Sequence, residues 1–291
     1  MALTVTIQSG GSFGVISGAT GFLGGVLAHH YAALGVNLIL IGRSAERLEM
    51  LKSSLEKSYK ISIQISELQF DGDFTQDLIR ELTPISGQID FFINTIGNQN
   101  PIGPMLNCSD SSWRMSFESN LIVPALLAKL FAGIFKTNGS GSIVLTSGGG
   151  ATNPRENFSS YASAKSGLVR FVETFALELS GTGVRINAIS PGVMPSTMMK
   201  EVVENSNAAG DSETMKAEAS LAESKWSPFK TLELMDFLIS TASDGISGKI
   251  ISADWDNWHE WPEHIEQLQQ SDLYTLRRIT GRDRNQTWGD I

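Results

Sequence analysis

Tyr161 and Lys165 are the residues whose types and spacing point most directly to chemistry. They lie four positions apart in a segment with helical spacing of apolar residues, so both side chains are expected on one helix face. A free phenol, with a pKa of about 10, is a poor acid or base at neutral pH. A neighbouring ammonium favours the phenolate, so Lys165 is expected to lower the pKa of Tyr161. The pair predicts proton exchange with a carbonyl or alcohol oxygen during hydride transfer, although such pairs also occur on solvated helix faces.

A glycine-rich turn lies between the first strand-like run and the first helical pattern. Glycine backbone lets a pyrophosphate approach closely, and the helix N-terminus that follows supplies amide donors. In this position the turn predicts a dinucleotide site rather than a tight turn that binds nothing. The expected contacts with the cofactor come from Gly18, Thr20, Gly21, Phe22, Leu23 and Gly24.

The residues after the second strand indicate which nicotinamide cofactor is bound. An acidic residue there usually holds the ribose 2′-hydroxyl of NAD, but this sequence has Arg43 and Ser44 instead. Arg43 offers a charge-assisted fork to a 2′-phosphate, and Ser44 a further donor. The sequence therefore favours NADP(H) over NAD(H), with a solvated arginine at a helix start as the alternative.

Strand-like and helix-like segments alternate along most of the chain, which predicts an α/β fold with a doubly wound parallel sheet of the Rossmann type. In such a sheet the ligand lies beyond the carboxyl ends of the strands. The expected strands are residues 13–17, 37–41, 61–70, 89–96, 142–146, 184–190 and 249–253. The longest expected helix covers about 111–135.

Two stretches interrupt this alternation within an expected single catalytic domain of residues 1–254. Residues 195–228 contain six acidic side chains and are long for a connection, so we expect a mobile lid over the site. Residues 255–291 hold four of the six tryptophans. This C-terminal extension is expected to pack on its own domain or on a second subunit, and stacking on a ring-bearing substrate is the alternative.

Composition excludes several other classes of protein. A net charge of −9 argues against nucleic-acid and anionic-membrane partners, which need a positive surface. A single cysteine, Cys108, forms neither an intrachain disulfide nor a cysteine-built zinc site, and the histidines lack convergent ligands, so no metal is expected. The start of the sequence lacks the pattern of a secretory signal, and the apolar run 121–135 is short for a membrane span. A cytoplasmic location is expected.

Further motifs make the sequence resemble the short-chain dehydrogenase/reductase family over roughly residues 12–254. They occur in the family's order along the chain. These motifs are the glycine turn, Asp71 after the third strand, Asn94 to Gly97 after the fourth, Asn120 in a helix, the Tyr161/Lys165 pair, and Pro191-Gly192 after the sixth strand.

The resemblance implies an NADP-dependent oxidoreductase that interconverts a ketone or aldehyde and an alcohol. It implies that Tyr161 is the general acid/base, that Lys165 also binds the nicotinamide ribose, and that Asn120 holds a water in a proton relay. A homodimer or homotetramer, paired through the helices at 111–135 and 159–179, is also implied. Further cofactor contacts implied by the resemblance are Asp71, Gly72, Asn94, Gly97, Pro191, Gly192, Val193 and Ser196.

The sequence departs from the family pattern at three places. One is the turn after the last strand, which reads Asp254-Trp255-Asp256 where the family often has a DGG-like turn, so the substrate side or the subunit contact there is expected to differ. The family's catalytic serine lies thirteen residues before the tyrosine, where this chain has Gly148, and Ser147 is expected to replace it through a shifted loop. The GxxGxxG turn resembles the extended branch of the family rather than the shorter reductases. Two alternatives therefore stay open: a non-catalytic NADP-binding sensor or scaffold, and a nucleotide-sugar epimerase or dehydratase.

Overall fold

The computed structural model describes residues 12–69, 74–223, 227–286 and 288. It contains a seven-stranded sheet in the order β3-β2-β1-β4-β5-β6-β7, in which each neighbouring pair of strands is parallel. The predicted doubly wound α/β fold is confirmed. The strands are β1 (Phe13–Ser17), β2 (Asn37–Gly42), β3 (Ile63–Glu67), β4 (Ile89–Asn94), β5 (Gly141–Thr146), β6 (Val184–Ser190) and β7 (Ile250–Ser252).

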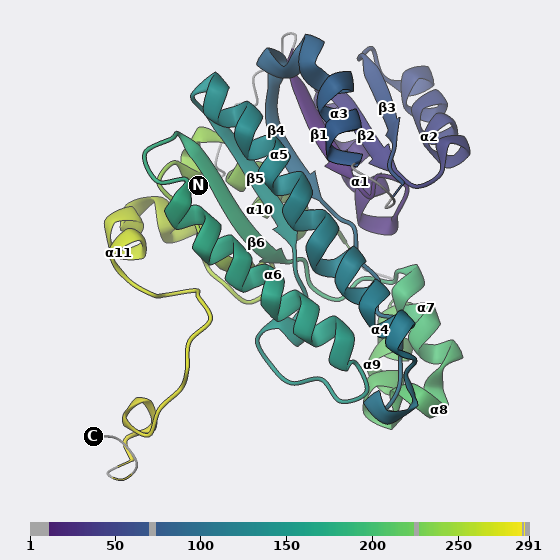
Figure 1. The fold of residues 1–291 in the computed structure, drawn as a ribbon, viewed down its shortest axis with the longest axis vertical. Helices are drawn as coiled ribbons and strands as arrows, with labels where there is room; N and C mark the ends of the chain where they lie inside the picture. The colour runs from purple at the N-terminus through teal and green to yellow at the C-terminus, as the bar shows by residue number, and fades with distance from the viewer. Residues whose placement is uncertain (1–11, 70–73, 224–226, 287, 289–291) are drawn as a thin grey trace.

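Helices cover both faces of this sheet. The chain visits them in the order α1 (Phe22–Ala33), α2 (Ala45–Ser58), α3 (Phe74–Leu82), α4 (Asp110–Phe117), α5 (Val123–Asn138), α6 (Ser159–Glu178), α7 (Thr197–Glu204), α8 (Ser206–Ala209), α9 (Asp211–Ala222), α10 (Phe229–Ile239) and α11 (Ile265–Gln270). In Figure 1, α5 and α6 cross the near face of the sheet and α10 lies behind it.

Alternation along the strands sends side chains into two separate apolar cores. In β2, for example, Leu38 and Leu40 join the core beneath α1, α2 and α10. Ile39 and Ile41 join the core beneath α3, α5 and α6. The sheet is therefore buried on both faces, as parallel sheets usually are.

The single long helix expected over 111–135 is divided by a π-helical turn, Glu118–Ile122, between α4 and α5. Such turns widen a helix locally and are frequent at functional sites. The whole stretch, Asp110–Asn138, is long and apolar enough to cross a membrane, but half of its most apolar window is buried inside the protein. Since α5 packs on the sheet, it is a core helix.

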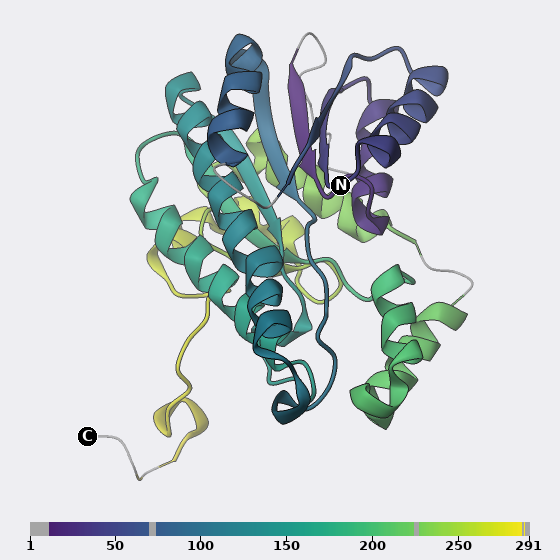
Figure 2. The ribbon, with the colours of Figure 1, turned by 45° about the vertical axis from the view of Figure 1, so that its right-hand side comes forward.

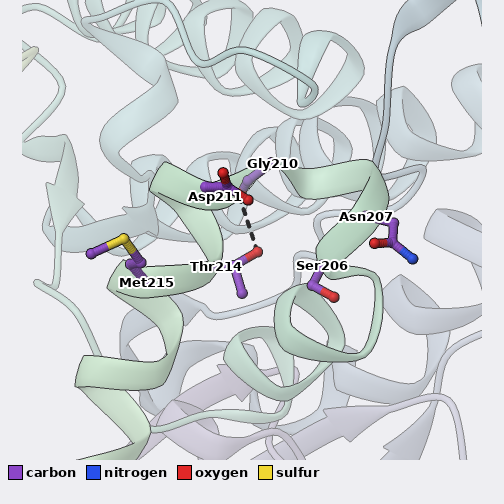
Figure 3. Close-up of a pocket in the computed structure, with 6 residues that line it drawn as sticks. All are labelled: Ser206, Asn207, Gly210, Asp211, Thr214 and Met215. Carbon is purple, nitrogen blue, oxygen red and sulfur yellow. Dashed lines mark hydrogen bonds between the residues drawn. The ribbon is translucent and has the colours of Figure 1, made fainter.

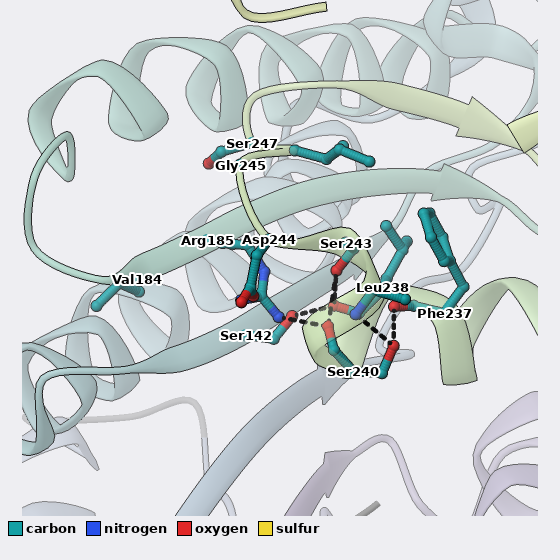
Figure 4. A network of polar contacts seen from close by, with 12 residues as sticks. Ser142, Val184, Arg185, Phe237, Leu238, Ser240, Ser243, Asp244, Gly245 and Ser247 are labelled. Carbon is teal, nitrogen blue, oxygen red and sulfur yellow. Dashed lines mark hydrogen bonds and ion pairs between the residues drawn. The ribbon is translucent and has the colours of Figure 1, made fainter. Parts of the chain in front are cut away.

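Polar groups from two strands hold the C-terminal end of α10 (Figure 4). Ser142 Oγ of β5 and Ser243 Oγ both donate to the carbonyl of Leu238, at 2.7 and 2.9 Å. Arg185 of β6 donates to the carbonyl of Ser240 at 2.9 Å and pairs with Asp244. The last carbonyls of a helix lack partners within it, so these contacts fix α10 against the sheet.

The lid region expected at 195–228 forms α7, α8 and α9. These helices lie beyond the end of the sheet toward which the strand arrows point (Figures 1 and 2). They bury Val202, Ala209 and Ala217 in a third apolar cluster together with Phe158 and Tyr161. The region expected to form a lid thus packs directly on the predicted catalytic tyrosine.

The chain after β7 first returns to its own domain. Trp258 and Trp261 are buried beside α10, and Trp258 stacks on Phe237 with ring centroids 5.4 Å apart. Farther on, the carbonyl of Tyr274 accepts a hydrogen bond from Ile250 N at 2.9 Å, alongside β7. Trp255, by contrast, is exposed.

Candidate active site

The glycine turn joins β1 to α1 at the carboxyl edge of the sheet, and its shape depends on the missing Cβ atoms. Gly18 has a φ of +74°, and a Cβ there would lie 2.7 Å from Thr95 Oγ1. A Cβ on Gly24 would lie 2.2 Å from the carbonyl oxygen of Gly18. Gly21 precedes α1, and no side chain caps that helix start. The turn therefore brings backbone without side chains to the start of a helix that no side chain caps, which fits a pyrophosphate group.

The side chains of this turn differ in what they offer a ligand. Gly21 and Phe22 are exposed and Thr20 is half-buried. Leu23 points into the core beneath α1, so only its backbone is left for a ligand.

The residues expected to select the cofactor lie where β2 enters α2. Ser44 caps α2, because its Oγ accepts a hydrogen bond from Arg47 N at 3.3 Å. Arg43 is exposed next to it. Arg47, one turn into α2, reaches across to the glycine turn and donates to the carbonyl of Thr20 at 2.6 Å. Arg47 was not predicted from the sequence, although it lies in the first turn of α2, close to the residues expected to select the cofactor. Asp71 and Gly72, the expected adenine contacts, lie outside the described residues.

Asn94, Gly97 and Asn120 meet at the carboxyl end of β4. Asn94 Oδ1 accepts a hydrogen bond from Ser17 Oγ at 2.8 Å, which ties β4 to β1. A Cβ on Gly97 would lie 3.0 Å from Asn120 Oδ1 and 3.2 Å from Lys165 Nζ. Both distances are shorter than an ordinary van der Waals contact, so glycine lets the chain pass close to these polar groups without displacing them.

The π-helical turn holds the Asn120 side chain rigidly. Its Nδ2 donates to the carbonyls of Asn98 and Ser116, both at 2.9 Å. Its Oδ1 accepts from Asn98 N at 3.2 Å. The amide is thus oriented by the protein, with Oδ1 on the side of Gly97 and Lys165.

Tyr161 and Lys165 are both buried in the first turns of α6. Lys165 Nζ donates to the carbonyl of Thr146, at the end of β5, at 2.9 Å, and it lies 5.9 Å from the centre of the Tyr161 ring. Burial lowers the pKa of Lys165 to about 7. Because Lys165 loses its proton near neutral pH, its positive charge stabilises the phenolate of Tyr161 only weakly.

The electrostatics of Tyr161 therefore differ from the expectation. Burial raises the pKa of Tyr161 above its usual value, and the charge that opposes this rise belongs to Arg155 rather than to Lys165. The phenol is protonated at neutral pH in this arrangement, because loss of its proton would leave a buried charge.

Gly148, not Ser147, lies next to the Tyr161 hydroxyl. A Cβ on Gly148 would be 2.2 Å from Tyr161 Oη. Ser147 Oγ is buried and makes no hydrogen bond to any described residue, Tyr161 included. The backbone explains this orientation: Ser147 N donates to the carbonyl of Ile189 at 2.7 Å and so extends the ladder between β5 and β6. Successive side chains along a strand point in opposite directions, so Ser147 does not take the position expected for it.

The Pro191-Gly192 turn follows β6 at the same edge of the sheet. Gly192 has a φ of +81°, and a Cβ there would lie 2.1 Å from Asp254 Oδ2. The Pro191 carbonyl accepts a hydrogen bond from Thr231 Oγ1 of α10 at 2.8 Å. Asp254 was not among the expected site residues, although it comes soon after the last strand.

The turn then leads into the lid. Val193 is exposed and Ser196, just before α7, is buried. A surface pocket of about 420 Å³ lies farther out on the lid, around the junction of α8 and α9 (Figure 3). The residues that line it include none of those predicted for the site.

A family model described as short chain dehydrogenase matches residues 14–207. The chain belongs to this family. It is an NAD(P)-dependent oxidoreductase that acts on CH–OH groups. In this chain β1, β4, the π-helical turn and α6 bring the glycine turn, Asn94, Asn120, Tyr161 and Lys165 to one edge of the sheet.

Individual relatives are distant in sequence but similar in fold. Diacetyl reductase [(S)-acetoin forming] from Staphylococcus epidermidis is 26% identical over 249 residues, covering 82% of this chain and 96% of the relative. A protein from Beutenbergia cavernae described as an NAD(P)-dependent gluconate 5-dehydrogenase, with NADP bound at low occupancy, superposes with a TM-score of 0.73 at 22% identity, over 84% and 95% of the two chains. NAD⁺-bound xylitol dehydrogenase gives a TM-score of 0.76 at 20% identity, over 84% and 98%. Eight of the curated relatives are matched over 62% to 96% of their own length.

Proposed function

We propose that this protein is an NADP(H)-dependent carbonyl reductase that interconverts a ketone or aldehyde and an alcohol, with Tyr161 as its acid and base. The observation that carries the proposal is the convergence of Lys165 Nζ and Asn120 Oδ1 on Gly97, next to a buried Tyr161. A packing role alone does not require a buried lysine, an oriented amide and a phenol at the same edge of the sheet.

Each of these groups has a defined task in the proposed mechanism. The nicotinamide cofactor, when bound, supplies or accepts the hydride at the substrate carbon. Tyr161 Oη donates its proton to the carbonyl oxygen in reduction and takes it back in oxidation. Lys165 Nζ and Asn120 Oδ1 supply the path by which a proton from solvent replaces the one lost by Tyr161. Gly18, Gly21 and Gly24 hold the pyrophosphate, and Lys165 the ribose of the nicotinamide.

The state of the phenol supports carbonyl reduction at neutral pH. Burial keeps the pKa of Tyr161 high, so the hydroxyl carries the proton that a carbonyl oxygen needs. Oxidation of an alcohol requires the phenolate and is expected to be faster at alkaline pH.

The direct test is the consumption of NADPH with a panel of small ketones and aldehydes, and of NADP⁺ with the matching alcohols. Net consumption of NADPH supports the reductase. Retention of the cofactor through a full catalytic cycle, without net consumption, would indicate the epimerase or dehydratase instead. Tight NADPH binding with no turnover on any carbonyl would favour a non-catalytic sensor, which the glycine at position 148 also suggests.

Arg43 and Arg47 are expected to confer the preference for NADP(H). Arg43→Ala and Arg47→Ala should each raise the KM for NADPH about tenfold or more, since a charge-assisted hydrogen bond contributes about 1.5–3 kcal/mol. The KM for NADH should stay unchanged in Arg43→Ala, because NADH has no 2′-phosphate. Arg47→Ala also removes the hydrogen bond to the Thr20 carbonyl in the glycine turn, so it should raise the KM for NADH as well, by a smaller factor than the KM for NADPH. Steady-state kinetics with both cofactors measure this, with Lys57→Ala at the far end of α2 as the control. Equal losses with NADPH and NADH would contradict the assignment.

Ser147→Ala is expected to change turnover by less than about threefold, because its hydroxyl bonds neither Tyr161 nor any other described residue. Removal of a buried hydroxyl without a partner should raise the free energy of unfolding by about 1 kcal/mol. Turnover assays and urea unfolding measure the two effects. A loss of turnover near the hundredfold typical of a lost transition-state donor would show that Ser147 contacts the substrate oxygen after all.

The proposal also includes a cytoplasmic location and a homodimer or homotetramer. Met115 and Ile122 leave apolar surface exposed along α4 and the π-helical turn, one of the regions implied for pairing. Sedimentation velocity distinguishes a monomer from a dimer and a tetramer.

A further inference from the structure

Arg155 holds a place in the site that the proposed mechanism does not use. It lies in the loop between β5 and α6, with its guanidinium carbon 3.8 Å from the centre of the Phe158 ring and 5.8 Å from that of Tyr161. A cation within about 6 Å of an aromatic ring is attracted to it. The guanidinium therefore has a preferred position beside the phenol.

Two further contacts fix the guanidinium from other parts of the chain. Nε donates to Glu213 Oε2 of α9 at 2.7 Å, and one terminal nitrogen donates to the buried Gln99 Oε1 at 3.3 Å. The side chains of Arg155 and Glu213 are only 18% and 16% exposed. Water screens such a pair much less than it screens a surface ion pair.

Glu213 is itself held as a carboxylate. Burial acts to raise its pKa, but the hydrogen bond from Lys216 and the charge of Arg155 outweigh burial, so the pKa lies below its usual value. Among the described residues, Lys165 on the same helix and Arg155 on the preceding loop lie beside the Tyr161 ring. Glu213, which also pairs with Lys216, joins this group through its ion pair with Arg155.

We propose that Arg155 is a positioning residue for the Tyr161 hydroxyl: it provides the fixed positive charge beside the phenol, and Glu213 of the lid sets its place and partly neutralises it. The inference deepens the proposed function and rests on it. Lys165 discharges near neutral pH, with its pKa at about 7, whereas an arginine remains charged at all physiological pH values. The lid therefore takes part in the electrostatics of the phenol as well as in covering it.

The two members of the pair should act on the phenol in opposite directions. Arg155→Gln removes the positive charge and should move the ionisation of Tyr161 to higher pH by about half a unit to one unit, as expected for a charge near 6 Å in a partly screened site. Glu213→Gln removes the neutralising carboxylate and should move it to lower pH. Arg155→Lys should restore part of the wild-type behaviour.

The decisive measurement is phenolate absorbance in the ultraviolet at increasing pH, with the signal of each Tyr161→Phe counterpart subtracted. Variants are compared at every pH at which circular dichroism shows that all of them are folded. At a given pH, the fraction of Tyr161 present as phenolate is expected to be highest in Glu213→Gln, intermediate in the wild type and lowest in Arg155→Gln. This readout needs no turnover, so it tests the inference even if no carbonyl substrate is reduced.

If the Arg155–Glu213 pair only holds the lid in place and has no electrostatic effect on the phenol, neither substitution should shift the ionisation of Tyr161. Glu201→Gln is the matched control, because Glu201 Oε2 on α7 also ties the lid to the β4 side, through Asn100 Nδ2 at 3.2 Å, but does not pair with Arg155. It should change the KM for substrate without shifting the phenol. Equal shifts in Arg155→Gln and Glu213→Gln, or no shift in either, would overturn the inference. In active enzyme, the alkaline limb of the pH–kcat profile should move in the same order.

Discussion

Replacement of Tyr161 by phenylalanine is expected to lower kcat by roughly a hundredfold to ten-thousandfold, the range for loss of a positioned general acid. The variant removes one oxygen and keeps the ring, which packs with Phe158 and Val202 beneath the lid. Ser147 Oγ makes no hydrogen bond to Tyr161 Oη, so this hydroxyl is not in place to supply the proton instead.

The loss should appear in kcat and not in cofactor binding. The glycine turn and Arg43 are distant in sequence from Tyr161, and the proposed ribose contact belongs to Lys165. NADPH affinity, measured by fluorescence titration, should therefore stay within about threefold of wild type. Tyr59→Phe is the matched control, since it removes the same oxygen from the end of α2. Turnover by Tyr161→Phe close to that of wild type would disprove the acid/base assignment.

The second large effect is expected at Gly24. Gly24→Ala should lower NADPH affinity by about a hundredfold or more and the free energy of unfolding by about 1–3 kcal/mol, the usual cost of overpacking. The added Cβ would lie 2.2 Å from the Gly18 carbonyl oxygen and 2.8 Å from Ala19 Cα. Both are backbone atoms, so α1 has to move away from the turn that it helps to form.

The neighbouring glycine supplies the control for this experiment. A Cβ on Gly25 would meet nothing closer than the Ala19 carbonyl oxygen, at 3.8 Å. Gly25→Ala should keep its affinity for NADPH and gain up to about 1 kcal/mol in stability, because alanine is the better helix former. Isothermal titration and thermal unfolding of both variants test the pair. Equal behaviour of the two alanines would mean that the turn tolerates side chains and does not bind a pyrophosphate closely.

The site residues that could be predicted from the sequence are those that lie at the end of a strand or in the first turns of a helix. Gly18, Asn94 and Lys165 each follow a short buried strand or open a helix, so their types and positions along the chain suffice to predict the edge at which they meet. The fold follows for the same reason, since buried strands such as β1 are runs of apolar residues bounded by glycines or polar turns. The π-helical turn was not predicted, because it changes the helix without interrupting its apolar pattern.

Contacts between distant segments were not predictable in the same way. Arg155 and Glu213 are 58 residues apart, and neither position carries a motif. The direction of Ser147 depends on a ladder hydrogen bond to Ile189, which extends strand alternation past the end of β5. The expected effect of Lys165 on the pKa of Tyr161 was inferred from their spacing alone. Burial has the largest effect on the pKa of both residues, and it depends on how the lid and the sheet pack around them.

The segment beside β7 has a consequence for the behaviour of the protein in concentrated solution. The outer strand of a sheet exposes backbone donors and acceptors that invite pairing with another molecule. One of these donors, Ile250 N of β7, donates a hydrogen bond to the Tyr274 carbonyl, and Trp261 packs in the core nearby. We therefore expect the residues after β7 to hinder the pairing of this strand with a second molecule, so that their removal should promote aggregation of the protein in concentrated solution.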